Sequence, residues 1–86
     1  MYCIELAIKL SPMPLVVQRK NHGDAKRLYA EIRQTIQKNN ERLLEITCEK
    51  VEDKRITVLV SEITAVQIYE KTSSSTSKRP GFSLAD

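Results

Sequence analysis

Histidine, cysteine and glycine, around which catalytic and ligand sites are often built, are scarce in this chain of 86 residues. The sequence holds one histidine, His22, two cysteines and two glycines. General-base catalysis needs an imidazole with a nucleophile and an orienting partner nearby. His22 stands in a polar turn at the start of a predicted helix, which favours a solvated loop residue. Two glycines are too few for a glycine-rich phosphate loop.

The cysteines, Cys3 and Cys48, lie far apart, and neither has a second Cys or His at the spacing of a metal site. We interpret them as reduced, partly buried thiols, with a redox or metal role as the alternative. The acidic pair Glu52 and Asp53 falls in a predicted turn, where it serves solubility. The serine run 73–77 lacks a base. The sequence therefore predicts no enzyme, no metal site and no cofactor.

Charge is distributed unevenly, although the net charge is only +3. Residues 19–42 carry +4, and residues 43–70 carry −3. A basic strand end and helix could bind RNA or DNA phosphates, with tyrosine side chains stacking on bases. The alternative is a solvated helix face that its own carboxylates balance. The candidate nucleic-acid-binding residues are Arg19, Lys20, Lys26, Arg27 and Arg33.

Apolar residues alternate in residues 2–10 and indicate a half-buried strand. Pro12 and Pro14 then interrupt the ladder, since neither has an N–H to donate, and residues 15–20 resume in extended form. The pair predicts a hairpin. Apolar residues at helical spacing follow from Ala25 to Ile36, with Asn21 and Asp24 as a capping box and Asn39-Asn40 as a left-handed stop.

Three further strands are predicted at residues 42–49, 55–60 and 63–69, and we expect them to form a meander. The predicted fold class is α+β in the order β-β-α-β-β-β, with one amphipathic helix packed on one face of a mainly antiparallel sheet. Residues 1–71 make up the predicted domain. Residues 72–86 are a Ser-rich, basic segment that we expect to be a disordered tail.

The second face of this sheet is also expected to carry apolar side chains, which a small domain usually buries against a partner. The residues that alternate onto it are Cys3, Ala7, Leu43, Leu59, Ala65 and Tyr69. We therefore expect a homodimer, formed by sheet packing or edge pairing. The resulting hypothesis is a non-enzymatic protein-interaction module with an unknown protein partner, and RNA or DNA binding is the alternative.

No apolar run approaches the roughly 20 residues of a membrane helix, and the N-terminus carries Glu5 where a signal peptide would be apolar. These features predict a cytoplasmic protein without a membrane partner.

Several blocks of the chain together resemble one known family. They are Ser11-Pro12-Met13-Pro14, Val17-Gln18-Arg19-Lys20, residues 44–50, residues 61–71 and Arg79-Pro80-Gly81-Phe82. The combination is similar to the small cyanobacterial proteins of uncharacterised protein family 0367, almost from end to end. The resemblance implies a cyanobacterial origin and a cytoplasmic location. It implies no activity, ligand or catalytic residue.

Overall fold

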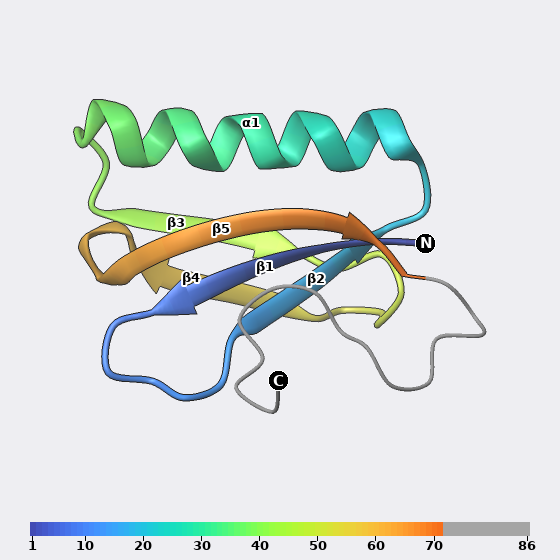
Figure 1. Ribbon diagram of the computed structural model, residues 1–86, viewed down its shortest axis with the longest axis horizontal. Helices are drawn as coiled ribbons and strands as arrows, with labels where there is room; N and C mark the ends of the chain where they lie inside the picture. The colour runs from blue at the N-terminus through green and yellow to red at the C-terminus, as the bar shows by residue number, and fades with distance from the viewer. Residues whose placement is uncertain (72–86) are drawn as a thin grey trace.

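The computed structural model describes residues 1–71, which form strands on one side of a single long helix (Figure 1). Strands β1 (Tyr2–Ile8) and β2 (Leu15–Arg19) precede helix α1 (His22–Lys38). Strands β3 (Leu43–Thr47), β4 (Arg55–Leu59) and β5 (Ile63–Glu70) follow it, and the 3-10 turn η1 (Val60–Glu62) joins β4 to β5. The predicted α+β class and element order are confirmed. The predicted tail, residues 72–86, lies outside the described residues.

The strands form two antiparallel sheets, in the orders β2-β1-β5 and β3-β4. The predicted meander is wrong, because β5 pairs with β1 instead of β4, from Tyr2 opposite Glu70 to Ile8 opposite Ile63. The turn η1 separates β5 from β4, and the Lys9 N–H donates to the Glu62 carbonyl at 2.8 Å. The burial of β1 explains why β5 pairs with it. Residues Cys3 to Leu6 are buried on both faces of β1, as a central strand with two neighbours requires.

The predicted hairpin is confirmed, with β1 and β2 paired from Tyr2 opposite Arg19 to Leu6 opposite Leu15. Its connection contains Pro12 and Pro14, which cannot donate to a ladder. Leu10 adopts a φ of 63°, a left-handed conformation that is uncommon for leucine. Leu10 is also 98% exposed. The Leu10 side chain therefore does not contribute to the core.

Helix α1 begins at the predicted Asn21 cap and ends at the predicted Asn39, whereas the Asp24 carboxylate of the predicted capping box accepts from Arg27. The Asn21 side chain accepts hydrogen bonds from the Gly23 and Asp24 N–H groups, at 2.7 and 3.3 Å, and so satisfies two donors of the first turn. Asn39 ends the helix in the left-handed conformation, and its N–H donates to the Thr35 carbonyl at 3.1 Å. Asparagine tolerates this conformation better than most residues.

The core lies between α1, the sheet β2-β1-β5 and the inner face of the β3-β4 hairpin. Helix α1 supplies Ala25, Leu28 and Ile32, which are all buried. The other buried members are Ile4, Leu6, Val17, Ile46, Cys48, Val58 and Ile63. Burying such side chains contributes roughly 1.5–3 kcal/mol each, so this single cluster dominates the stability of the domain.

The second face of the sheets is buried in one part and exposed in the other. On β1, Cys3 is 2% exposed and Glu5 is 1% exposed. On the hairpin, Leu43 and Leu59 stand opposite each other and are 54% and 42% exposed. The sequence therefore assigned the right residues to this face, but it did not indicate that a carboxyl group would be the most buried of them.

Candidate interaction surfaces

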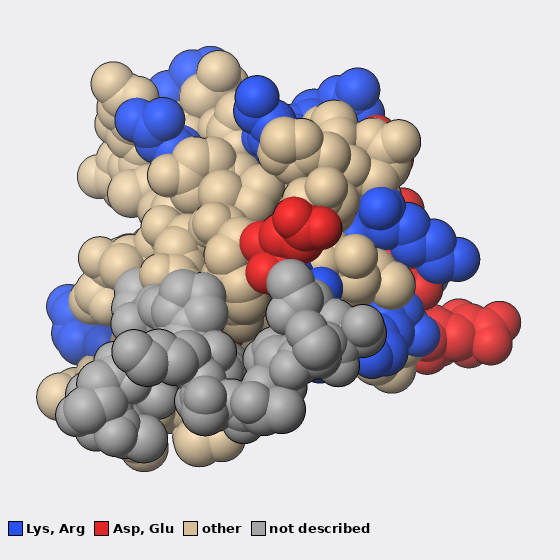
Figure 2. All heavy atoms as spheres, turned by 45° about the vertical axis from the view of Figure 1, so that its right-hand side comes forward, with Lys and Arg blue, Asp and Glu red and all other residues tan. Residues whose placement is uncertain are grey.

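The five candidate nucleic-acid-binding residues do not form one surface. On a helix, Lys26 and Arg33 lie on one flank because they are seven residues apart, whereas Arg27 lies about 100° round the axis from Lys26. The Arg33 guanidinium stands over the Tyr29 ring, 5.8 Å from its centroid. In the view of Figure 2, the Lys and Arg side chains lie in several separate groups, with uncharged and acidic side chains between them. The sequence leaves open whether these side chains converge, and the spacing along α1 turns Arg27 away from Lys26 and Arg33.

Two of these candidates already bind groups of their own chain. Arg19 donates from Nη1 to the Thr47 carbonyl at 2.6 Å, and Arg27 forms an ion pair with Asp24 at 2.9 Å. Arg19 and Arg27 line one small cavity, but Asp24, Glu31 and Glu49 line it with them. Lys20 remains exposed at the end of β2. Nucleic-acid binding by this set stays a prediction, and its exposed members are Lys20, Lys26, Arg27 and Arg33.

His22 is the first residue of α1 and not a loop residue, although it is exposed as predicted. Its ring stacks on Tyr2, with centroids 4.8 Å apart and an interplanar angle of 21°. This contact ties the helix start to the first residue of β1. Within residues 1–71, no three His, Cys, Asp or Glu side chains are close enough to hold a metal ion.

Both cysteines are free and buried. The Cys48 sulfur accepts the Gln18 N–H at 3.3 Å. Burial alone would raise the pKa of the Cys48 thiol, but backbone N–H groups of Val51, Gln18 and Lys50 and the Lys54 ammonium together bring that pKa below its ordinary value. Cys48 therefore anchors the β3-β4 connection to β2.

That connection covers the outer edge of β2 with several hydrogen bonds. The Glu49 N–H donates to the Gln18 carbonyl at 2.9 Å, and the Lys54 ammonium donates to the Val16 carbonyl at 3.0 Å. The Glu49 carboxylate accepts the Lys20 N–H at 2.7 Å. This edge of the three-stranded sheet is thus already occupied.

The outer edge of β5 is different. The Lys71 N–H donates to the Met1 carbonyl at 2.8 Å, and the antiparallel register continues without a shift as far as Ala7 opposite Ala65. Because hydrogen-bonded and non-hydrogen-bonded pairs alternate in an antiparallel ladder, Val66, Ile68 and Glu70 direct their N–H and C=O groups away from β1. Within residues 1–71, β5 has no second neighbouring strand. We call these outward backbone groups the β5 edge.

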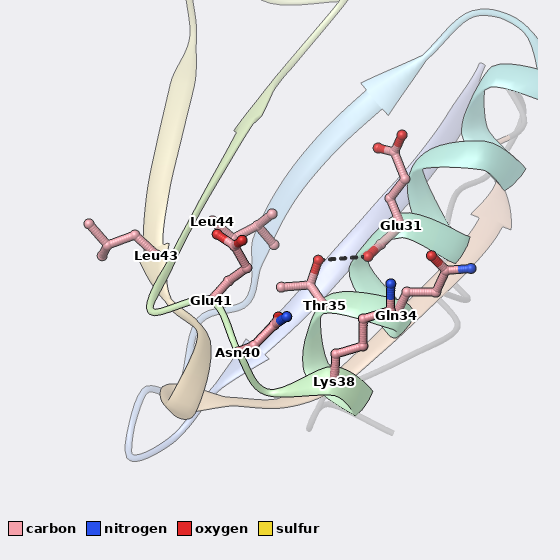
Figure 3. Close-up of a pocket in the computed structure, with 8 residues that line it drawn as sticks. All are labelled: Glu31, Gln34, Thr35, Lys38, Asn40, Glu41, Leu43 and Leu44. Atoms are coloured by element: carbon pink, nitrogen blue, oxygen red, sulfur yellow. Dashed lines mark hydrogen bonds between the residues drawn. The ribbon is translucent and has the colours of Figure 1, made fainter.

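The close-up in Figure 3 shows a cavity of ≈ 360 Å³ between the second half of α1 and the start of β3. Leu44 points toward the helix and Leu43 points away. The Thr35 hydroxyl donates to the Glu31 carbonyl at 2.9 Å, so it is satisfied within the helix. The lining residues are Glu31, Gln34, Thr35, Lys38, Asn40, Glu41, Leu43 and Leu44. They include neither an imidazole nor a thiol that could act as base or nucleophile.

None of the helices described in residues 1–71 has the length and apolar character needed to cross a membrane. Fold and surfaces together define a small α+β protein with one helix over antiparallel strands and, in the described part of the chain, an uncovered strand edge at β5. The chain belongs to the UPF0367 protein family, whose model matches residues 3–71. The resemblance seen in the sequence is confirmed.

Relatives in cyanobacteria share nearly the whole chain. A UPF0367 protein of Prochlorococcus marinus (strain NATL1A) is 83% identical over 84 residues, which is 98% of each chain. Another, from Prochlorococcus marinus (strain MIT 9303), is 60% identical over 85 residues and 98% of each chain. One from Synechococcus sp. (strain CC9311) is 60% identical over 84 residues, covering 96% of this chain and 76% of the relative. No solved structure matches the chain.

Proposed function

We propose that the protein is a non-enzymatic protein-interaction module that forms a homodimer through the β5 edge. The observation that carries this proposal is that the two edges of the sheet β2-β1-β5 differ in their hydrogen bonding. The β2 edge accepts hydrogen bonds from Glu49 and Lys54, whereas the β5 edge has no strand beside it within residues 1–71. Unpaired N–H and C=O groups in a row are a template for another strand.

The composition of β5 also supports pairing. It is the longest strand described, with eight residues, and Glu70 is its only charged residue. The strands β3 and β4 are both end strands of their two-stranded sheet and have five residues each, and the exposed Arg55 of β4 lies 3.7 Å from Glu45 of β3. Short length and charge are the features that discourage edge pairing. Of these three strands, β5 is therefore the best site for a partner.

The proposal is tested by size-exclusion chromatography with light scattering on the full chain over a range of concentrations. We expect a mass that approaches twice 9.8 kDa. A chain that stays monomeric at every concentration would contradict the proposal. A dimer alone does not locate the interface, so a variant is needed.

Val66→Pro is the variant that addresses the edge. The outward N–H of Val66 has no partner strand within residues 1–71, and proline is tolerated at such edge positions. In a symmetric dimer the change removes one interchain hydrogen bond from each copy, at about 1 kcal/mol each. We expect the dissociation constant to rise by about 30-fold, since about 1.4 kcal/mol is a factor of 10.

Val66→Ala is the matched control, because it removes a similar part of the half-buried side chain and keeps the N–H. We expect Val66→Ala to weaken dimerisation much less than Val66→Pro, because it keeps the interchain hydrogen bonds. Circular dichroism and thermal unfolding check that both variants fold. Equal dimerisation of the two variants would show that the β5 edge is not the interface.

A further inference from the structure

We propose that the β5 strands of two copies pair antiparallel about a two-fold axis that passes between their Gln67 residues. This inference rests on the proposed function, because it assumes that the β5 edge carries the dimer. It adds the partner strand and its register, which the open edge alone does not specify.

The alternation of backbone groups restricts the register. Interchain hydrogen bonds need outward groups on both strands, and on β5 these belong to the even-numbered residues Val66, Ile68 and Glu70. Even residues must therefore face even residues of the partner, because the groups of odd residues are used by β1. Any two-fold axis centred on a residue of β5 satisfies this rule, and we compare the axes at Val66, Gln67 and Ile68, near the middle of the strand.

The axis at Val66 is disfavoured by charge. It places Glu70 opposite the partner's Glu62 on both sides of the dimer, and like charges directly opposite each other destabilise a strand pair. The axis at Ile68 pairs only residues 66–70 within β5, because Thr64 then faces a position beyond the end of the strand. The first alternative thus brings like charges together, and the second shortens the ladder.

The axis at Gln67 pairs residues 64–70 of one β5 with residues 64–70 of the other. Val66 then faces the partner's Ile68, Ala65 faces the partner's Tyr69, and Thr64 faces the partner's Glu70. Lys71 comes opposite the partner's Ile63, so no like charges face each other at this end of the strand. Apolar and β-branched cross-strand pairs of this kind stabilise antiparallel ladders.

The Gln67 side chain gives a second, independent reason. Its Nε2 group is buried and has no hydrogen-bond acceptor within residues 1–71, and a buried unpaired donor is unfavourable. With the axis at Gln67, the partner's Gln67 lies directly opposite in a non-hydrogen-bonded pair, where side chains approach most closely. After a change of rotamer, the two primary amides can each donate an N–H to the other's carbonyl oxygen.

Cysteine cross-linking tests the register directly. A Gln67→Cys chain would place two thiols in a non-hydrogen-bonded pair with Cα atoms about 4.5 Å apart, within the range of a disulfide. Ala65→Cys is the matched control on the same sheet face. Position 65 and its copy would be offset by four residues, about 13 Å, which is out of reach. Both variants carry Cys3→Ala, because Cys3 lies diagonal to position 67.

The experiment combines mild oxidation with diamide, non-reducing electrophoresis and light scattering of the reduced chains. We expect most of the Gln67→Cys chain to become a covalent dimer and Ala65→Cys to give no such band. Cross-linking only in a mixture of the two variants would move the axis to Val66 and overturn the register. A dimer by light scattering that Gln67→Cys does not cross-link overturns the register and leaves the proposed function standing. A monomer by light scattering overturns both.

Discussion

The buried carboxyl group of Glu5 leads to the prediction that the structure specifies most closely. Glu5 is 1% exposed in the middle of β1, and the Tyr69 hydroxyl donates to its Oε2 at 2.6 Å. That distance lies at the short end of the range for O–H···O hydrogen bonds. Removing the donor takes this partner from a buried carboxyl oxygen, which costs about 1–3 kcal/mol. We therefore expect Tyr69→Phe to lower the free energy of unfolding by about 2 kcal/mol.

The assay is urea and thermal unfolding followed by circular dichroism, at equal protein concentrations because self-association shifts apparent stability. For a domain of this size, each kcal/mol changes the Tm by about 4–8 °C, so the Tm should fall by about 10 °C.

Tyr29→Phe is the matched control. It also removes one hydroxyl, but the Tyr29 ring keeps its contact with the Arg33 guanidinium. We expect a change within about 0.5 kcal/mol, as is usual where no buried hydrogen bond is lost. If Tyr69→Phe were no more destabilising than Tyr29→Phe, the assignment of a stabilising Tyr69–Glu5 bond would be wrong.

Two further predictions concern α1 and Cys48. Asn21→Ala removes the side chain that accepts from Gly23 and Asp24, and we expect a loss of about 1 kcal/mol in urea unfolding; an unchanged midpoint would count against the cap. The pKa of Cys48 is lower in the folded chain than in the unfolded one, so its contribution to stability is complete above the unfolded-chain pKa of about 8.5 and is lost as the pH falls. Relative to Cys48→Ser under reducing conditions, the stability of the wild type should rise from neutral pH toward about pH 8.5, by at most about 1.4 kcal/mol per pH unit; parallel profiles would contradict this.

The elements that depend on local signals could be predicted from the sequence. Helix α1 has its cap at Asn21 and its left-handed end at Asn39, as predicted, because each signal acts within a few residues. The alternation in residues 2–10 likewise predicts β1, although the strand itself ends at Ile8. In both cases the pattern depends only on neighbouring residues.

The pairing of β5 could not be predicted in this way. The sequence of β5 would alternate in the same way whether the strand paired with β4 in a meander or with β1. What decides between the two is the short turn before Ile63 and the burial of β1 on both faces, which requires a strand on each side of it. The same limit applies to the interaction surface. Lys26 and Arg27 look like one basic cluster in the sequence, but helix geometry separates them, and Asp24 forms its ion pair with Arg27. Which strand edge stays unpaired depends on how all the strands pair, and the sequence alone does not specify this.

The hydrogen bonds from Glu49 and Lys54 to the outer edge of β2 limit the number of chains that can assemble. A sheet with two free edges could add copies at both sides and grow into a fibre, whereas a two-fold axis at β5 uses the same edge of both copies at once. The outer strands that remain are then β2, whose carbonyls at Val16 and Gln18 are already bonded, and the short strands β3 and β4, which carry the charges of Glu45 and Arg55. Association through β5 therefore closes after two chains, and the bonds to β2 help keep the product finite.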